Sequence, residues 1–368
     1  MKKVLIAINF DEGLYNFRKE LIEALIEASY EVHIVLPDGE YISRLQQMGC
    51  IFHETAFRRR GKNPMEECRL IARYSRILRE VRPDVVLTYT IKPNLYVGML
   101  CGMRRIPYIT TITGLGTAVE GTGLLQKLTQ AMYRMAMRKA AVVFFQNTAN
   151  EKLFTDRRIA PGKHRMLPGS GVNLEHFSYQ EFPAEGPVEF LFISRVMKEK
   201  GIEQYLDAAE AVRKRYPDTV FRILGFLEED YEGTERFRRM TEQGVVRFEG
   251  SVEDVVPYIR NSQCTVHPSF YPEGMSNVCL ESAACGRAVI TTDRAGCRET
   301  VKDGETGFLV KERDSADLTE KILQFLEMPA KEREQMGRRG RAYMESCFDR
   351  RIVVKHYLDA VAELTMQQ

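Results

Sequence analysis

Hydrophobic and polar residues divide this chain into two kinds of segment that alternate along its length. Short runs of apolar, often β-branched residues predict buried parallel strands, and longer segments with apolar residues at helical spacing predict amphipathic helices. In the first half the predicted strands are residues 4–8, 31–36, 84–88, 108–112 and 141–145. The clearest predicted helices between them are 17–28, 66–81 and 123–139. Strands and helices in alternation are typical of an α/β fold with a parallel sheet.

The same pattern begins again in the second half of the chain. Its predicted strands are 189–193, 220–224, 246–249, 263–267, 288–292 and 307–310, and its predicted helices are 202–216, 252–260, 277–285 and 315–328. Two successive series predict two doubly wound domains, which we place at residues 1–175 and 183–345. The stretch 182–188 contains two prolines and a glycine and is the predicted linker. The last segment, 346–368, has apolar residues at helical spacing and must pack on a structure that is already built.

Composition limits the class of protein. The chain has 368 residues, of which 44% are hydrophobic and 28% charged, and this excludes a disordered chain, a collagen-like fibre and a small disulfide scaffold. No segment offers the roughly 18 consecutive apolar residues of a membrane-spanning helix. The apolar run near the N-terminus is short and leads directly into Asp11 and Glu12, so we interpret it as a first strand and not as a signal peptide.

Cysteine placement and charge add two expectations. The eight cysteines are scattered, with no CxxC pair and no histidine at zinc-ligand spacing, which predicts a reducing cytosol and no structural metal site. The net charge of +2 conceals an asymmetry, because residues 1–170 carry +10 and the remaining residues carry −8. A basic half indicates that the first domain meets an anionic surface or ligand, although part of the imbalance is solvated surface.

The most informative stretch for chemistry runs from His267 to Gly286. A predicted strand ends in a loop rich in turn formers, and a short helix follows with Ser276 as its candidate N-cap. Glu273 then lies in the loop ahead of the helix, and Glu281 lies about one turn inside it. Free amides and the helix dipole suit phosphate oxygens at this terminus, and a carboxylate one turn deeper suits a ribose diol. The alternative is that both glutamates are solvated surface charges.

In each domain, the loop after the first strand is a further candidate for ligand binding. In the second domain, Arg195 and Lys200 bracket a loop that opens a helix, so both cations can converge on a pyrophosphate; the alternative is a pair of surface cations. In the first domain, Gly13 permits close approach of a ligand to the backbone before a helix. The surrounding residues are not GxGxxG, so a nicotinamide or flavin dinucleotide site is not supported.

Together these motifs resemble a known family. The run EGMSNVCLE matches the E-x7-E motif of the retaining glycosyltransferases of family 4, and the likeness continues through ISRVMKEKGI, VRFEGSVEDVVPYI, ACGRAVITTDRAGCRETVKDGETGFLV and LPGSGVNLEHF. It covers essentially the whole chain and is densest over 189–312. The resemblance implies the GT-B fold, with two facing Rossmann-like domains and a C-terminal helix that crosses back to the first domain.

Carried over residue by residue, the resemblance implies a donor-binding and catalytic set. Arg195 and Lys200 would hold the donor diphosphate and stabilise it as it leaves, which is the work of a metal in other enzymes. Glu273 would lie near the donor sugar hydroxyls and Glu281 on the ribose. The remaining implied donor contacts are the backbone amides of Gly274, Met275, Ser276 and Asn277, the turn at Gly13, and a base pocket lined by Arg247 and Phe248.

The chain departs from the family at one place. Several members have a histidine in the first domain near the reacting sugar, but here no histidine follows the strands that end near residues 88 and 112. Thr90, Lys92, Thr113 and Gly114 lie in that neighbourhood, so no protein base is assigned there. His267 precedes the Glu273 loop, and we expect it to have a structural role.

The basic first domain also offers a candidate membrane or acceptor surface. Four cations cluster within a few residues: Arg58, Arg59, Arg60 and Lys62. The predicted helices 66–81 and 123–139 are basic as well, and basic amphipathic helices can lie on anionic bilayers. Many proteins that the chain resembles act on undecaprenyl-diphosphate-linked sugars at the inner face of the membrane. For each helix the alternative is a solvated basic face.

The expected function is therefore a metal-independent, retaining hexosyltransferase that moves a sugar from a UDP-linked donor to a lipid-linked saccharide in bacterial surface-polysaccharide biosynthesis. We expect it in the cytoplasm, peripheral on the inner face of the cell membrane, with no cofactor. Two alternatives stay open: a sugar-nucleotide epimerase of similar fold, and a non-catalytic nucleotide-sugar-binding protein. A nucleic-acid partner is not expected, because the basic residues lack interleaved aromatics on a recognised module.

Overall fold

The computed structural model describes residues 1–55, 64–114, 124–160 and 162–366. The chain forms two compact units. The first unit comprises Met1–Ser170 together with Arg350–Gln368, and the second comprises Gly171–Asp349. The cluster at residues 58–62 lies outside the described residues.

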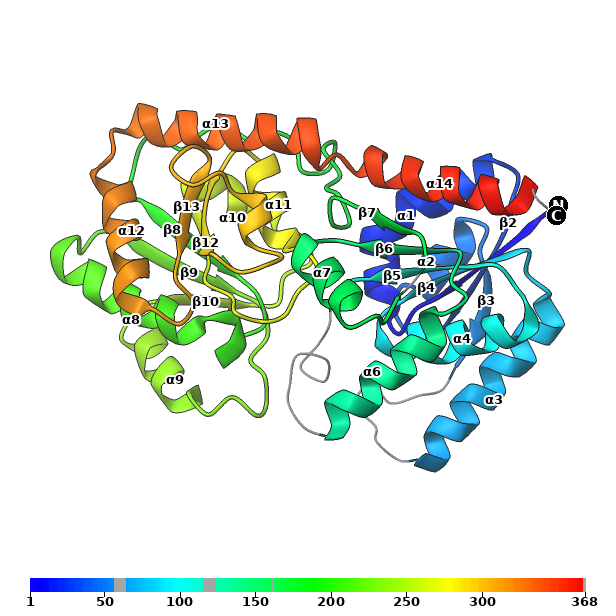
Figure 1. Ribbon diagram of the computed structural model, residues 1–368. Coiled ribbons are helices and arrows are strands. Elements are labelled where there is room, and N and C mark those ends of the chain that lie inside the picture. Colours follow the sequence, from blue (N-terminus) through cyan, green and yellow to red (C-terminus); the bar gives the residue numbers. More distant parts are fainter. Residues whose placement is uncertain (56–63, 115–123, 161, 367–368) are drawn as a thin grey trace. The chain divides into compact units, whose positions relative to one another are not determined.

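The described part of the first unit contains a parallel sheet of seven strands in the order β3-β2-β1-β4-β5-β6-β7 (Figure 1). The strands are β1 (Lys3–Ala7), β2 (Glu31–Leu36), β3 (Ile51–Glu54), β4 (Val85–Tyr89), β5 (Tyr108–Ile112), β6 (Val142–Phe145) and β7 (His164–Met166). The helices are α1 (Asp11–Glu27), α2 (Ile42–Gln47), α3 (Pro64–Val81), α4 (Ile91–Arg104), α6 (Leu124–Met137), α7 (Thr148–Asp156) and α14 (Arg350–Met366). Side chains of α3, α4, α6 and α7 form one apolar layer on the sheet, and those of α1, α2 and α14 form the other.

The second unit repeats this architecture with six parallel strands in the order β10-β9-β8-β11-β12-β13. The strands are β8 (Glu189–Ile193), β9 (Val220–Leu224), β10 (Arg247–Gly250), β11 (Cys264–His267), β12 (Ala288–Thr292) and β13 (Gly307–Val310). The helices are α8 (Ile202–Arg215), α9 (Thr234–Glu242), α10 (Val256–Asn261), α11 (Asn277–Ala284), α12 (Ser315–Glu327) and α13 (Ala330–Cys347). The expected class, α/β with two Rossmann-like units and parallel sheets, is confirmed.

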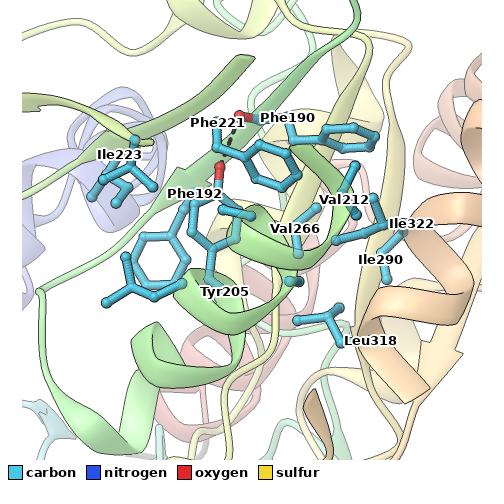
Figure 2. Close-up of a cluster of buried hydrophobic side chains, with 14 of the residues drawn as sticks. Phe190, Phe192, Tyr205, Val212, Phe221, Ile223, Val266, Ile290, Leu318 and Ile322 are labelled. Atoms are coloured by element: carbon cyan, nitrogen blue, oxygen red, sulfur yellow. Dashed lines mark hydrogen bonds between the residues drawn. The ribbon is translucent and has the colours of Figure 1, made fainter. Parts of the chain in front are cut away.

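Aromatic side chains dominate the core of the second unit. Phe190, Phe192 and Phe221 project from the sheet toward α8, where Tyr205 lies among them (Figure 2). The Tyr205 hydroxyl is buried but satisfied, because it donates to the carbonyls of Phe190 at 2.9 Å and Arg222 at 3.0 Å. Each such ring contributes about 1.5–3 kcal/mol by leaving water. This core holds the carboxyl ends of β8 and β11 in fixed positions.

The C-terminal helix α14 is part of the first unit. Val353, Tyr357, Ala360 and Val361 are fully or almost fully buried in the layer formed with α1. The Tyr357 hydroxyl lies 2.5 Å from Thr111 Oγ1 at the end of β5. The last helix thus returns to the first sheet, as the family resemblance implied.

The chain passes between the units at residues 170–171, before the predicted linker at 182–188. A buried arginine explains this difference. Arg287 is fully buried, and its guanidinium donates to the carbonyls of Gln180 at 2.8 Å and Glu181 at 2.6 Å. Arg341 donates in the same way to Phe177 at 2.7 Å. These bonds hold the segment before the linker on the second unit, and the prolines lie in an irregular stretch inside that unit.

Candidate active site

The sheet order of the second unit locates its candidate site. The direction of chain progression reverses between β8 and β11, which are neighbours in the sheet. In open parallel sheets, ligands bind beyond the carboxyl ends of the strands at such a switch point. The loop after β8 carries Arg195 and Lys200, and the loop after β11 carries Glu273. The topology therefore brings the three predicted catalytic residues to one edge of one sheet.

Two backbone features hold these loops together. Gly201 has a φ of +79°, and a Cβ at this position would overlap the Pro268 carbonyl in the loop after β11. The amide of Phe270 donates to the Glu199 carbonyl at 2.9 Å. The left-handed turn at Gly201 ends the short 3₁₀ turn Lys198–Lys200 and starts α8, so it positions Lys200 beside the Glu273 loop.

Lys200 and Glu273 form an ion pair in which the Lys200 ammonium donates to Glu273 Oε1. Each side chain is only 13% exposed. Ser269 Oγ donates to the same oxygen at 3.2 Å, and His267 Nε2 lies 3.7 Å from it. Burial alone would raise the pKa of Glu273, but the charge of Lys200 and the neighbouring His267 outweigh burial and hold that pKa well below its usual range. Glu273 is therefore an ionised carboxylate at neutral pH.

Arg195 is also paired with a carboxylate. Its Nη1 lies 2.5 Å from Oε1 of Glu228, in the segment after β9. The Arg195 guanidinium lies 5.6 Å from the ring centroid of Tyr271, and the Lys200 ammonium lies 5.1 Å from the same centroid. Both cations thus lie near the same aromatic ring in the loop after β11.

The helix that follows Glu273 begins where the sequence predicts, with Ser276 at the N-cap position of α11. The side chain of Ser276 does not cap the helix. Its backbone amide, which we expected to meet a ligand oxygen, instead donates to the Gly296 carbonyl at 2.7 Å. The buried side-chain oxygens Ser276 Oγ and Asn277 Oδ1 have no hydrogen-bond partner, so they are polar groups that a ligand could satisfy.

The structure also shows where the remaining residues expected to contact the donor lie. Gly274 and Met275 are buried between Glu273 and the helix, and Glu281 is a half-buried residue one turn inside α11. Gly13 is the third residue of α1, where a Cβ would overlap the ring of Phe10, so packing is enough to explain the glycine.

Arg247 and Phe248 do not join this group. They are the first residues of β10, at the amino end of the strand, whereas the ligand edge is at its carboxyl end. Arg247 is exposed, and Phe248 packs edge-on against Phe237 with ring centroids 5.0 Å apart. An aromatic that the sequence analysis did not consider, Phe226, follows the carboxyl end of β9 and is 51% exposed.

The first unit has its own switch point between β1 and β4. Thr90, directly after β4, has a φ of +64° although it is not glycine, and its buried Oγ1 has no hydrogen-bond partner. Asn9 Oδ1, after β1, is likewise buried and without a partner. Strained backbone and unsatisfied polar groups cluster at functional sites. Lys92 is paired with Glu67 at 2.7 Å, so this charge is already neutralised within the unit.

One group among the described residues brings three potential metal-ligand atoms close together. His267, Glu273 and Cys297 each place a ligand atom within 4.8 Å of the others. The Lys200 ammonium already donates to the same Glu273 oxygen. A metal ion there would have to compete with that ammonium, and Lys200 supplies positive charge at the carboxylate without one.

Solved structures of known proteins define the class of this fold. The chain superposes on a sucrose-phosphate synthase from Thermosynechococcus elongatus with a TM-score of 0.82 at 19% identity, covering 100% of both chains. It superposes on Anabaena Alr3699/HepE in complex with UDP and glucose with a TM-score of 0.79 at 18% identity, covering 99% of this chain and 100% of that one. The fold is GT-B, the fold of two Rossmann-like domains found in glycosyltransferases.

Family models give the assignment within that class. Residues 13–169 match the glycosyl transferase 4-like domain, and residues 175–343 match the glycosyl transferases group 1 domain. The chain belongs to this family of glycosyltransferases.

Two curated relatives match over nearly their whole length. The N,N'-diacetylbacillosaminyl-diphospho-undecaprenol alpha-1,3-N-acetylgalactosaminyltransferase of Campylobacter jejuni is 24% identical over 364 residues, 94% of each chain. The capsular polysaccharide biosynthesis glycosyltransferase CapM of Staphylococcus aureus is 24% identical over 346 residues, 90% of each chain.

Proposed function

We propose that this glycosyltransferase moves a hexose from a UDP-linked donor to a lipid-linked saccharide, with retention of anomeric configuration and without a metal ion, in bacterial surface-polysaccharide biosynthesis. The observation that carries the proposal is the convergence of Arg195, Lys200 and Glu273 at the switch point of the second unit. Two relatives matched along their length support the acceptor class, since one is named for a diphospho-undecaprenol substrate and the other for capsule synthesis. A neighbour in complex with UDP and glucose supports the donor class.

The chemistry assigned to these residues follows from their charges. The bond between the sugar and the diphosphate breaks with negative charge developing on the leaving phosphate. Arg195 and Lys200 supply two positive charges there, in surroundings mostly shielded from water, and so favour departure. They provide the charge that a metal supplies in other transferases, which is why we propose a metal-independent reaction.

Glu273 is proposed to act beside the donor sugar as a carboxylate. With its pKa held low by Lys200, it stays ionised and can accept hydrogen bonds from sugar hydroxyls and stabilise positive charge that develops on the ring. Glu281, one turn inside α11, is proposed to bind the ribose. The acceptor's proton then goes to the leaving phosphate, so no protein base is required in the first unit.

A peripheral location at an anionic membrane is proposed from the surface of the first unit. No helix among the described residues is both long enough and apolar enough to cross a membrane. Large apolar side chains are nevertheless exposed on its helices: Met65 on α3, Met103 on α4, and Leu128 and Met135 on α6. Exposed basic residues also lie on α3 and α6, a combination that suits an anionic bilayer surface.

The test is a transfer assay with a panel of UDP-hexoses and UDP-N-acetylhexosamines and synthetic undecaprenyl-diphosphate-linked saccharides. We expect a product only when donor and acceptor are both present, unchanged turnover in EDTA, and an α-linkage by NMR from an α-linked donor. A thermal-shift screen selects the donor beforehand, because a ligand at 100 times its Kd stabilises the protein by about 2.7 kcal/mol. Epimerised donor without acceptor would favour the epimerase alternative, and binding without turnover across the panel would favour a non-catalytic binding protein.

A further inference from the structure

The segment that follows β9 holds a carboxylate against one of the two donor-site cations. Glu228 Oε1 lies 2.5 Å from Arg195 Nη1, and the side chains are 15% and 29% exposed, respectively. Neither the family motif nor the expected site includes Glu228. The pair therefore needs its own explanation.

Backbone hydrogen bonds fix this pair in place. The amide of Val196 donates to the Phe226 carbonyl at 2.8 Å, and the amide of Glu228 donates back to the Val196 carbonyl at 3.2 Å. Gly225 has a φ of +129°, and a Cβ there would overlap the Ser194 carbonyl. Because the two loops are tied together on both sides of the pair, Glu228 is held beside Arg195 by the fold.

Each of the two cations at this site is paired with a carboxylate. Arg195 is paired with Glu228 and Lys200 with Glu273, while both cations approach the ring of Tyr271. A nucleoside diphosphate carries at least two negative charges and needs the same guanidinium. Its phosphate oxygens and the Glu228 carboxylate compete for one donor group and repel each other in a partly buried, low-dielectric setting.

We propose that Glu228 is the internal counter-ion of Arg195, a residue that competes with the nucleoside diphosphate and sets the affinity of the site for donor and product. This inference rests on the proposed function, because it takes Arg195 as a ligand of the diphosphate. When the donor binds, Arg195 exchanges part of its contact with Glu228 for phosphate oxygens. When the spent nucleoside diphosphate leaves, Glu228 takes the guanidinium back, which favours product release.

The chain offers a matched pair of variants to test this competition. Glu228→Gln keeps the volume and one oxygen acceptor for Arg195 but removes the charge. Glu229→Gln, at an exposed neighbouring position, makes the same change in net charge and serves as the control. Affinity for UDP is measured by calorimetry, and the inhibition constant of UDP is measured in the transfer assay. Glu228→Ala removes the charge in a second way, and thermal unfolding checks that each variant is folded.

We expect Glu228→Gln and Glu228→Ala to bind UDP about 5- to 30-fold more tightly than wild type, with the larger factor at low salt, and to show correspondingly stronger product inhibition. Glu229→Gln should match wild type within about twofold, because an exposed charge is well screened. Equal or weaker UDP binding by both Glu228 variants overturns the inference.

Arg195→Met separates this failure from failure of the proposed function. It should weaken UDP binding by at least about tenfold, since it removes a charge-assisted contact. If wild type binds no nucleotide, or if Arg195→Met binds UDP as wild type does, the donor site itself is misplaced. If Arg195→Met behaves as expected and the Glu228 variants do not, only the role of Glu228 is wrong.

Discussion

Replacing Glu273 and Glu281 one at a time by glutamine tests the division of labour proposed for the donor site. Glu273 has the more constrained surroundings, because its Oε1 accepts hydrogen bonds from Lys200 and from Ser269 at 3.2 Å. Glutamine preserves the volume and one oxygen for these donors but removes the charge. Glu281 lies in α11, where glutamine is a comparably good helix former.

The two substitutions should change different kinetic constants. Glu273 is proposed to lie where positive charge develops in the transition state, so Glu273→Gln should mainly lower kcat. A ribose contact is shared by ground and transition states, so Glu281→Gln should mainly raise the donor KM. A hydrogen bond to a charged group contributes about 1.5–3 kcal/mol, which corresponds to a change of about 10- to 150-fold in the affected constant.

The depressed pKa of Glu273 adds a pH criterion. A carboxyl whose pKa is lowered in the folded state is ionised throughout the neutral range, and its stabilising contribution is lost only as pH falls below the usual carboxyl range. The kcat deficit of Glu273→Gln should therefore be the same at about pH 6 and about pH 8. A deficit that changed by the full factor across this interval would show that Glu273 titrates there as an acid or base.

Donor-saturation kinetics at fixed acceptor concentration decide the question, with Glu229→Gln as the charge-matched control and thermal unfolding as the check on folding. If Glu273→Gln raised only KM, Glu273 would be a ground-state binding residue. If both variants kept wild-type kcat and KM, the donor reaction would take place elsewhere, and the proposed roles would lose their main residue-level support.

Two further predictions concern stability and membrane binding. Arg287→Met should lower the free energy of unfolding in chemical denaturation by about 3–5 kcal/mol, because it leaves several carbonyls, such as those of Gln180 and Glu181, without their buried donor. Arg338→Met at the surface should unfold close to wild type, because an exposed ion pair adds little to stability, and similar losses for both variants would refute the argument. Removing the basic cluster should weaken sedimentation with phosphatidylglycerol vesicles at low salt, each nearby cation contributing about 1 kcal/mol, and unchanged binding, or equal binding of wild type to phosphatidylcholine vesicles, would contradict the membrane proposal. The substituted residues, each changed to serine, are Arg58, Arg59, Arg60 and Lys62.

Strands were the most predictable part of this fold, because a parallel strand buried on both faces is rich in apolar and β-branched residues along its length. The strands 31–36, 108–112 and 288–292 have the predicted bounds. Helices were less predictable where glycine and proline interrupt the pattern. Residues 91–104 form α4 although they include Pro93, which the first turn of a helix tolerates. Residues 330–347 form α13, although they include two glycines. A Cβ at one of them, Gly337, would overlap the Gly286 carbonyl between α11 and β12, so close packing explains this glycine.

The sequence predicted which residues form the site, but it did not predict which side chains they pair with. The family resemblance assigned Arg195, Lys200 and Glu273 to one donor site, and the structure brings them to one edge of the sheet because parallel strands end on the same side. The partners Glu228 and Ser269 were not predictable, since a charged or hydroxyl residue in a loop reveals nothing of its tertiary neighbour. Arg287 was missed for the same reason, because arginine in a sequence indicates surface unless its carbonyl acceptors are known.

The pairings matter because they give the substitutions at this site effects of different sign on nucleotide affinity. Removing positive charge at Arg195 weakens the attraction for a diphosphate, and removing negative charge at Glu228 strengthens it. Glu273 differs from both, because its carboxylate is proposed to act on the sugar and its loss should appear in kcat. A site that bound nucleotide through general surface attraction would respond to Glu228 and Glu229 alike, since both substitutions change the net charge by the same amount. Opposite responses at Arg195 and Glu228, with no response at Glu229, would require the specific geometry of this one edge of the sheet.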